Sequence, residues 1–343
     1  MREDKLSIRR YNYIPYDPNP TDSFEFGLSE KNLDYSLSEK NLDSDRDDKL
    51  NRSIYDCKNK PYQGTELILK EGQYPSKDQS ANEVYEHLGN IDNFYKKVFG
   101  RNSIDNRGFK IVANVHFDIE YETAFWSIDK KQIFYGEGDA SSDRQDFYSF
   151  TSCIDVSAHA FAHGMIQYES KLNYAFETGA LCESIADVFA IMVRQYINEE
   201  KSDESRWLLG RELLATSLNP PNYSYLGMRS LKTPGQANIC DLQVAHMDDY
   251  RVLPEVFDNG GVHINSGIPN KAFYLLATAL GGYSWNIAGK IWYNALVGSN
   301  LTSSTTFKDF AYITVSRTRD KFGQRFANIV ADSWSQVGIH VSL

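Results

Sequence analysis

The sequence predicts an α+β fold with a strand-rich N-terminal half and a mostly helical C-terminal half. Between residues 109 and 139, β-branched and aromatic residues alternate with polar ones, which is typical of strands. Beyond residue 262 the apolar residues recur at helical spacing instead. The chain has 343 residues, of which 41% are hydrophobic, and this is enough for two domains with sizeable cores. We therefore expect two folded domains behind an N-terminal extension.

The charge and composition of the chain exclude two classes of partner. Its formal net charge is −10, which disfavours binding to a polyanion. The sequence contains no basic tract, and it contains no apolar run of membrane-spanning length. We expect no nucleic-acid partner and no membrane span, and we expect a peptide or protein as partner.

The residues that report on cellular compartment favour the cytoplasm. The first ten residues carry charges of both signs and lack the apolar segment of a secretory signal. Four cysteines form no short-spaced pattern, so we expect free and mostly buried thiols at Cys57, Cys153, Cys182 and Cys240. The chain is expected to be cytoplasmic as synthesised, with export by a non-classical route left open.

The first 51 residues differ from the rest because they are polar, acidic and rich in turn residues. Nine residues at 28–36 recur almost unchanged at 37–45. Two copies are too few for a stacked repeat fold, which needs at least three units. A disordered tail or flexible tether is the simplest interpretation of this segment.

Taken in order, the remaining elements begin with an amphipathic helix from Ser80 that ends before Gly100. Strands follow at 109–117 and within 124–139, where a turn is expected at residues 129–130. Later segments at 269–282 and 284–297 are helical, with Ser284 as the expected N-cap of the second. Thr306 and Asp309 then resemble a capping box.

The functional pattern lies between residues 155 and 187, where His159 and His163 stand four residues apart in an apolar, helix-compatible run. Positions i and i+4 share one helix face, so both imidazoles can meet one tetrahedral cation, and zinc is the natural candidate. Glu183 follows on what reads as a second helix, with Asp187 one turn further on. The other histidines, which we take as structural or surface residues, are His87, His116, His246 and His340.

This spacing resembles the thermolysin family of zinc metalloendopeptidases, whose signature is His-Glu-x-x-His followed by a downstream Glu and, four residues later, Asp. The resemblance extends over about residues 52–343 and includes YGEGD and DNGGVHINSG. It implies zinc ligands at His159, His163 and Glu183, with Asp187 orienting His159. Zinc held in this way keeps a fourth position for water, whose pKa it lowers to about 7. Before Glu183 the family commonly has an amide side chain that supports the second histidine, whereas this chain has Cys182.

The resemblance also implies roles for residues outside the zinc ligands. His263, held by Asp258, and Tyr174 would stabilise the negative charge that develops on the scissile carbonyl oxygen. Arg229 would bind a substrate carbonyl, and Ala124 and Trp126 would contact the peptide, although Thr123 replaces the family's usual Asn. The bond would be cut on the amino side of a hydrophobic residue. The pocket for the side chain of that residue would be lined by Phe147, Phe150, Val156, Leu209 and Met228.

At one position the pattern is interrupted, because Ala160 stands where the family has its catalytic glutamate. The general base that takes the proton from water is then missing. Such a base typically raises the rate by roughly 10²- to 10⁴-fold. Two explanations compete. A glutamate was replaced deliberately to trap an intact form, which we favour, or the chain is a natural pseudoprotease that grips a peptide or protein without cutting it.

The resemblance also suggests how the chain is divided and which second metal it lacks. We expect a propeptide or tether over 1–51 that binds in cis, a β-rich catalytic domain over 52–169 ending in the two-histidine helix, and a helical domain over 170–343, with the zinc site between the two domains. The family's paired calcium site is predicted absent, because only Asp155 matches a ligand while other ligand positions carry Arg194, Arg206, Leu208 and Arg211. Arg194 is expected to pair with Asp155.

Overall fold

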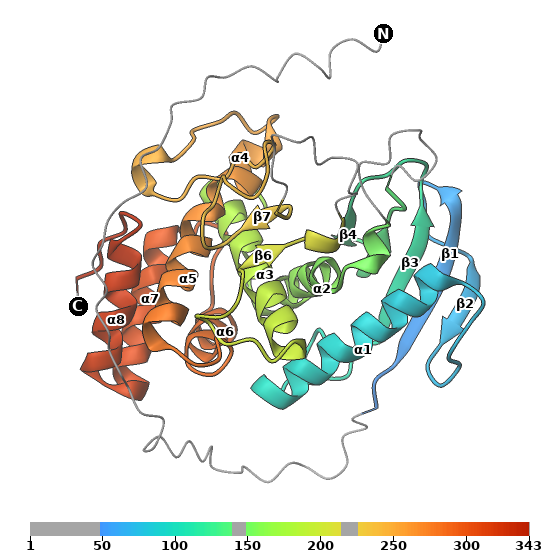
Figure 1. The fold of residues 1–343 in the computed structure, drawn as a ribbon, viewed down its shortest axis with the longest axis horizontal. Coiled ribbons are helices and arrows are strands. Elements are labelled where there is room, and N and C mark those ends of the chain that lie inside the picture. The colour runs from blue at the N-terminus through green and yellow to red at the C-terminus, as the bar shows by residue number, and fades with distance from the viewer. Residues whose placement is uncertain (1–48, 139–148, 214–225, 343) are drawn as a thin grey trace. The chain divides into compact units, whose positions relative to one another are not determined.

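The computed structural model describes residues 49–138, 149–213 and 226–342 of the chain, all within one unit, Asp47–Leu343. Within this unit two central helices separate a small sheet from a group of C-terminal helices (Figure 1). The strand-rich first part and the helical second part agree with the predicted fold class. No helix in the described part of the chain is both long and apolar enough to cross a bilayer.

A five-stranded mixed sheet forms the first part, in the order β2-β1-β3-β5-β4. Its strands are β1 (Arg52–Lys60), β2 (Glu66–Lys70), β3 (Ile111–Phe117), β4 (Ala124–Ser127) and β5 (Gln132–Tyr135). The predicted strands and the turn after Ser127 are present, whereas β1 and β2 were not predicted. The last three residues of β1, Lys58–Lys60, are polar and exposed, so the strand shows no clear alternation of apolar and polar residues. β4 is an edge strand, and its residues Ala124, Phe125 and Trp126 line the cavity described below.

Helix α1 (Gln79–Phe99) confirms the predicted amphipathic segment. Asp78 caps its N-terminus by accepting a hydrogen bond from the backbone N–H of Ala81 at 2.8 Å. Gly100 ends it in the left-handed conformation at φ 64°, which glycine adopts without the steric cost of a side chain. The apolar face of the helix, including Leu88 and Ile91, is fully buried.

Helices α2 (Ile154–Glu169) and α3 (Phe176–Ile197) pack against each other at the centre of the described unit (Figure 1). Most of α3 is buried on all sides, which is expected of a helix that is apolar around its whole circumference. The polar residues that remain on the facing sides of these two helices therefore lie in the interior, where each needs a partner.

The described second part of the unit contains short strands and five helices, of which α4 to α7 pack against α3 and α8 packs against α5 and α7. The elements are β6 (Leu208–Leu209), β7 (Arg229–Ser230), α4 (Asp258–Asn265), α5 (Gly267–Leu280), α6 (Ala288–Val297), α7 (Phe307–Phe322) and α8 (Gln324–Ser335), with 3-10 helices η3 (Arg211–Leu213) and η5 (Met247–Asp249). A further 3-10 helix, η2 (Phe150–Ser152), precedes α2. The capping box of Thr306 and Asp309 is present at the start of α7. The predicted N-cap at Ser284 is wrong, because α6 begins at Ala288 and the buried Ser284 hydroxyl donates to Gln195 Oε1 at 2.5 Å.

The cysteines and the N-terminal segment were also the subject of predictions. The free-thiol prediction is confirmed for all four cysteines, of which only Cys240 is exposed. The predicted propeptide, apart from its last three residues, and Phe147 lie outside the described residues.

Candidate active site

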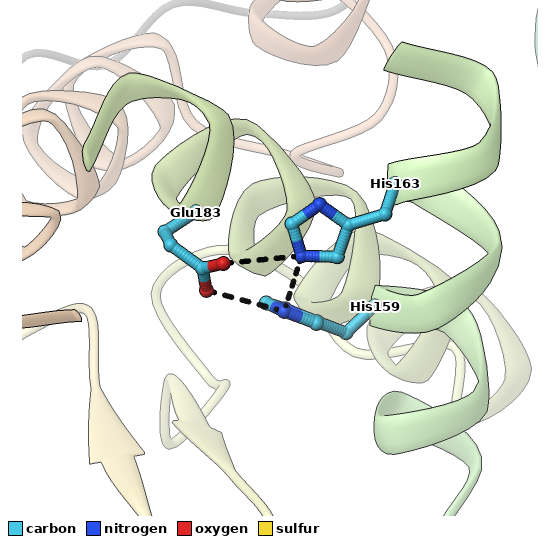
Figure 2. Close-up of side chains that lie close together, drawn as sticks. All are labelled: His159, His163 and Glu183. Atoms are coloured by element: carbon cyan, nitrogen blue, oxygen red, sulfur yellow. Dashed lines mark hydrogen bonds and ion pairs between the residues drawn. The ribbon is translucent and has the colours of Figure 1, made fainter. Parts of the chain in front are cut away.

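The two histidines of α2 and the glutamate of α3 converge on one point, as Figure 2 shows. His159 Nε2 lies 3.3 Å from Glu183 Oε2, and His163 Nε2 lies 3.2 Å from Glu183 Oε1. The two Nε2 atoms are 3.0 Å apart. The i, i+4 spacing on α2 places both rings on one face, and the packing of α3 against that face brings the carboxylate to them. The predicted ligand group is therefore assembled.

Asp187 supports this group from one turn further along α3. Its Oδ1 lies 2.9 Å from His159 Nδ1, the contact predicted to orient that ring. The Arg229 guanidinium binds the same carboxylate with both Nε and Nη2, at 2.9 and 2.6 Å. Asn270 of α5 donates to it as well, at 2.9 Å. Sequence reasoning missed Asn270, and the only signal for it is a lone amide in the apolar stretch that forms α5.

A second histidine group comes from the start of α4. Asn259, Gly260 and Gly261 all have positive φ, which turns Asp258 back so that it accepts from the His263 N–H at 2.9 Å and lies 2.5 Å from Nδ1. A Cβ on Gly260 would lie 2.3 Å from the Phe176 ring, so this turn requires glycine. His263 Nε2 is left facing Glu183 Oε2 at 3.3 Å. The Tyr174 hydroxyl donates to Glu183 from a neighbouring position.

The donor set of this site fits a zinc ion. Glu183 Oε2 is buried and accepts no hydrogen bond in the described structure, although two imidazole nitrogens lie 3.3 Å from it. Zinc prefers ligand sets of this kind, in which imidazole nitrogens are combined with a carboxylate oxygen. His159, His163 and Glu183 would therefore hold the metal, with His263 and Tyr174 beside it.

The charges of the ligand group follow from burial and from the neighbouring charged side chains. Burial lowers the pKa of His163, which favours the neutral imidazole that a metal ligand must be. Burial opposes the charged form of His159 as well, but the Asp187 and Glu183 carboxylates outweigh it and raise the pKa of His159 to about 9. Burial raises the pKa of Glu183, yet His263 and His163 hold that pKa well below its usual value.

A cavity of about 490 Å³ opens beside the ligand group. Among the residues predicted to bind substrate, those that line it are Ala124, Trp126, Phe150, Val156, Leu209, Met228 and Arg229. Edge strand β4 forms one wall, and β6 with β7 forms another. Cys182 also lines the cavity, and burial raises the pKa of its thiol, so the thiol is neutral. Ala160 is fully buried in α2.

Gln167 is a cavity residue that sequence reasoning missed. Its Oε1 accepts a hydrogen bond from Trp126 Nε1 at 2.7 Å, and its Nε2 donates to the Ile128 carbonyl at 3.2 Å. The amide therefore links α2 to the edge strand and to the residue that follows it. A signal existed in the sequence, because Gln167 continues the series of His159 and His163 at i+8 on the same helix face.

Comparison with known proteins places the chain among metalloproteases. Residues 20–167 match the thermolysin metallopeptidase catalytic domain, and residues 170–339 match the thermolysin metallopeptidase alpha-helical domain. Protease PrtS of Photorhabdus sp. (strain Az29) is 46% identical over 299 residues, which cover 86% of this chain and 78% of the relative. The chain belongs to the thermolysin family. An extracellular metalloprotease of Pectobacterium carotovorum subsp. carotovorum is 40% identical over 298 residues, 85% of this chain and 82% of that protein.

The solved structures lead to the same family. The precursor of protealysin, a metalloproteinase from Serratia proteamaculans, superposes with a TM-score of 0.77 at 40% identity, covering 85% of this chain and 88% of that one. The thermolysin-family fold and a neutral metalloprotease function acting on peptides are thus shown for this chain. The family uses a catalytic zinc, and the His159, His163 and Glu183 group is consistent with that metal.

Proposed function

We propose that the chain is the precursor of a zinc metalloendopeptidase that cuts on the amino side of hydrophobic residues and that Ala160 disables. The observation that carries this proposal is the meeting of His159, His163 and Glu183 at the end of a mostly apolar cavity. When bound there, zinc supplies Lewis-acid chemistry for peptide hydrolysis. The residues of the chain itself bind the peptide, orient it and stabilise developing charge.

Peptide binding is proposed to use the edge of the sheet and the cavity together. β4 is the last strand of the sheet in the described residues, and an extended peptide can form main-chain hydrogen bonds along its outer edge, beginning at Ala124. Next to it, Phe150, Val156, Leu209 and Met228 form an apolar pocket. Burying a Leu or Phe side chain in such a pocket is worth roughly 1.5–3 kcal/mol, which favours peptides with those residues after the scissile bond.

Stabilisation of the scissile carbonyl oxygen is assigned to His263 and Tyr174. The negative charge of Glu183 raises the pKa of His263. Burial opposes this rise and the hydrogen bond to Asp258 adds to it, so the ring favours the protonated form that donates from Nε2. Burial and the nearby Glu183 raise the pKa of Tyr174, which keeps its hydroxyl as a donor. Two donors beside the metal ligands are suited to a negative charge that appears only in the transition state.

The missing step is proton transfer from water to the leaving amine. Ala160 has a methyl group and no titratable atom, so it provides no general base between the two histidines. We therefore expect the Ala160 chain to hold zinc and bind peptide but to be impaired in hydrolysis, and we expect it to retain residues 1–51 as an uncut propeptide bound in cis.

The test is to compare the zinc-loaded full-length chain with A160E and with A160Q, which controls for the added volume. A160E should cleave a quenched peptide with Leu after the scissile bond at least about 100-fold faster than either of the others. Intact-mass measurement should also find A160E shortened near Arg52 and the parent uncut. Equal and negligible activity in all three proteins would favour the rival proposal, a pseudoprotease that binds peptides without cutting them.

We also propose how the chain is divided and where it is made. The domain limits are 1–51, 52–169 and 170–343, and synthesis in the cytoplasm with non-classical export is proposed for localisation. The paired calcium site is proposed absent. In support, Arg194 Nε lies 2.9 Å from Asp155 Oδ2, which is the predicted pair, and a guanidinium group there repels a hard dication.

A further inference from the structure

Beyond the zinc site, one largely buried arginine connects three elements beside the cavity. Arg194, in the last turn of α3, places Nε 2.9 Å from Asp155 Oδ2 in the first turn of α2. Its Nη1 lies 2.8 Å from Glu212 Oε1 in η3. The Asp155 side chain is fully buried, whereas about half of the Glu212 side chain is exposed. Arg194 thus joins a buried carboxylate to one that lies at the surface.

Asp155 also binds the backbone just before η3. Its Oδ2 accepts a hydrogen bond from the backbone N–H of Gly210 at 3.0 Å. Gly210 has a φ of +65°, and a Cβ on it would lie 2.5 Å from Met228 Cγ, so this turn also depends on glycine. The backbone at Gly210 and the side chain at Glu212 are therefore both fixed to Asp155 and Arg194.

The segment that these contacts fix is a wall of the cavity. Leu209, Gly210 and Met228 all line it, where β6 and β7 pair through only two residues each. A two-stranded pair is marginal by itself in water, so it requires other contacts to keep its position. Leu213 supplies apolar contacts with Phe150 and Cys153, and the Arg194 group supplies the polar ones.

The positive charge among Cys153, Asp155 and Glu212 is supplied by the guanidinium group of Arg194. Cys153, Asp155 and Glu212 place potential ligand atoms within 4.8 Å of one another, as a metal site would. Arg194 already contacts all three, with Nη2 3.7 Å from Cys153 Sγ. Planar guanidinium groups match carboxylates through parallel hydrogen bonds, so Arg194 satisfies the geometry that a metal would otherwise have to satisfy.

We infer that Arg194 is a positioning residue for substrate selection. By holding Leu209–Glu212 against α2 and α3, it fixes the width of the pocket that receives the hydrophobic side chain. This inference rests on the proposed function and deepens it. Loosening the wall should reduce the preference for a large side chain more than it reduces the rate for a small one, because only the large side chain contacts the displaced wall.

The experiment uses full-length A160E and two peptides that differ only in Leu or Ala after the scissile bond. The variants are R194M and E212A, where E212A leaves Asp155 paired with Arg194 and keeps the test valid if R194M does not fold. R211M is the matched control, because Arg211 is an exposed arginine in the same 3-10 turn. The ratio of kcat/KM for Leu over Ala should fall about tenfold in R194M and E212A and stay unchanged in R211M.

A second measurement does not need activity. Hydrogen exchange in the Ala160 chain should be faster over residues 207–213 in R194M and E212A than in R211M. Unchanged exchange and an unchanged Leu-to-Ala ratio would overturn the inference, as would a lower thermal midpoint with no change in the ratio. If A160E itself does not cleave either peptide, the proposed function fails, and the exchange comparison alone then decides whether Arg194 anchors the wall.

Discussion

Asp187 shows how much of the site depends on single buried side chains. Its carboxylate lies against His159 on one side and binds Arg229 and Asn270 on the other. A buried anion is costly unless it is paired and hydrogen-bonded, and Arg229 together with His159 and the Asn270 amide meets that requirement. Burial raises the pKa of Asp187, but Arg229 and His159 outweigh it and lower the pKa far below its ordinary value, so the group stays ionised.

Gln167 gives the first prediction at the scale of one residue. Q167L leaves Trp126 Nε1, which is largely buried, without its acceptor, and this should lower the free energy of unfolding by about 1–3 kcal/mol. Q167E keeps the acceptor for Trp126 and should retain most of the stability. Urea denaturation measures both. Equal losses in the two variants would show that the Trp126 hydrogen bond is not the cause.

His116 gives a prediction about pH. The Glu137 carboxylate, 2.8 Å from Nδ1, and Asp78, 2.9 Å from Nε2, outweigh burial and raise the pKa of His116 to about 9. Because this pKa is higher when folded, the stabilisation is fully present below the unfolded value of about 6.5 and is lost as the pH rises through 9. A quarter of the side chain is exposed, so we discount its size to about 1–2 kcal/mol.

The measurement is the unfolding free energy of the parent and H116N at pH 6 and pH 10. Asn is the appropriate replacement because the residue has a φ of 55°, a conformation that Asn tolerates. The parent should be the more stable protein at pH 6, and the difference should nearly vanish at pH 10. A difference that is constant over this range would contradict the assigned ion pairs.

At the scale of elements, the ends of helices follow local rules only where the capping side chain has no other partner. Thr306 and Asp309 form a complete capping box for α7. Ser284 precedes a helical sequence just as well, but its hydroxyl binds the buried Gln195, and α6 starts four residues later. The need to satisfy a buried amide outweighed the gain from capping.

The cap of α7 provides a quantitative prediction. T306A removes the hydroxyl that accepts from the Asp309 N–H and should lower the unfolding free energy by about 0.5–2 kcal/mol. K308A changes an exposed residue of the same first turn and should have an effect below about 0.5 kcal/mol. Thermal or urea unfolding of both variants distinguishes them. Equal effects would show that the cap contributes nothing measurable.

For the whole molecule, the zinc group couples the first part of the chain to the second. His159 and His163 belong to α2, Glu183 belongs to α3, and His263 reaches the same point from α4. A ligand that binds only the folded state stabilises it by about 4 kcal/mol at 1,000 times its dissociation constant. Metal removal should therefore affect the stability of the unit as well as its chemistry.

The last prediction concerns metal removal and replacement. Dialysis against a chelator should lower the thermal midpoint by on the order of 10 °C, and stoichiometric zinc should restore it. Millimolar calcium added to the zinc-loaded protein should leave the midpoint unchanged, because Arg194 occupies the cluster around Asp155. Either a midpoint insensitive to the chelator or a large calcium-dependent rise lost in D155A would contradict these assignments.

The sequence by itself determined the fold class, the metal pair, the amphipathic α1 and the cap of α7. Each depends on spacing within one segment, such as the four residues between His159 and His163 or the three between Thr306 and Asp309. Backbone geometry converts these spacings directly into positions on a helix face or at a helix end. The carboxylate at Glu183 became recognisable because Asp187 follows it by one helical turn.

Only the tertiary structure decided which distant polar groups pair. Trp126 and Gln167 are 41 residues apart, and Asp187 and Arg229 are 42 apart. Arg194 binds Glu212 of η3 in addition to Asp155, the partner that the family resemblance predicted. No local period links such residues, because their pairing depends on how the elements pack. Packing removes these polar groups from water, and each buried group must then bond to whichever partner the neighbouring element presents.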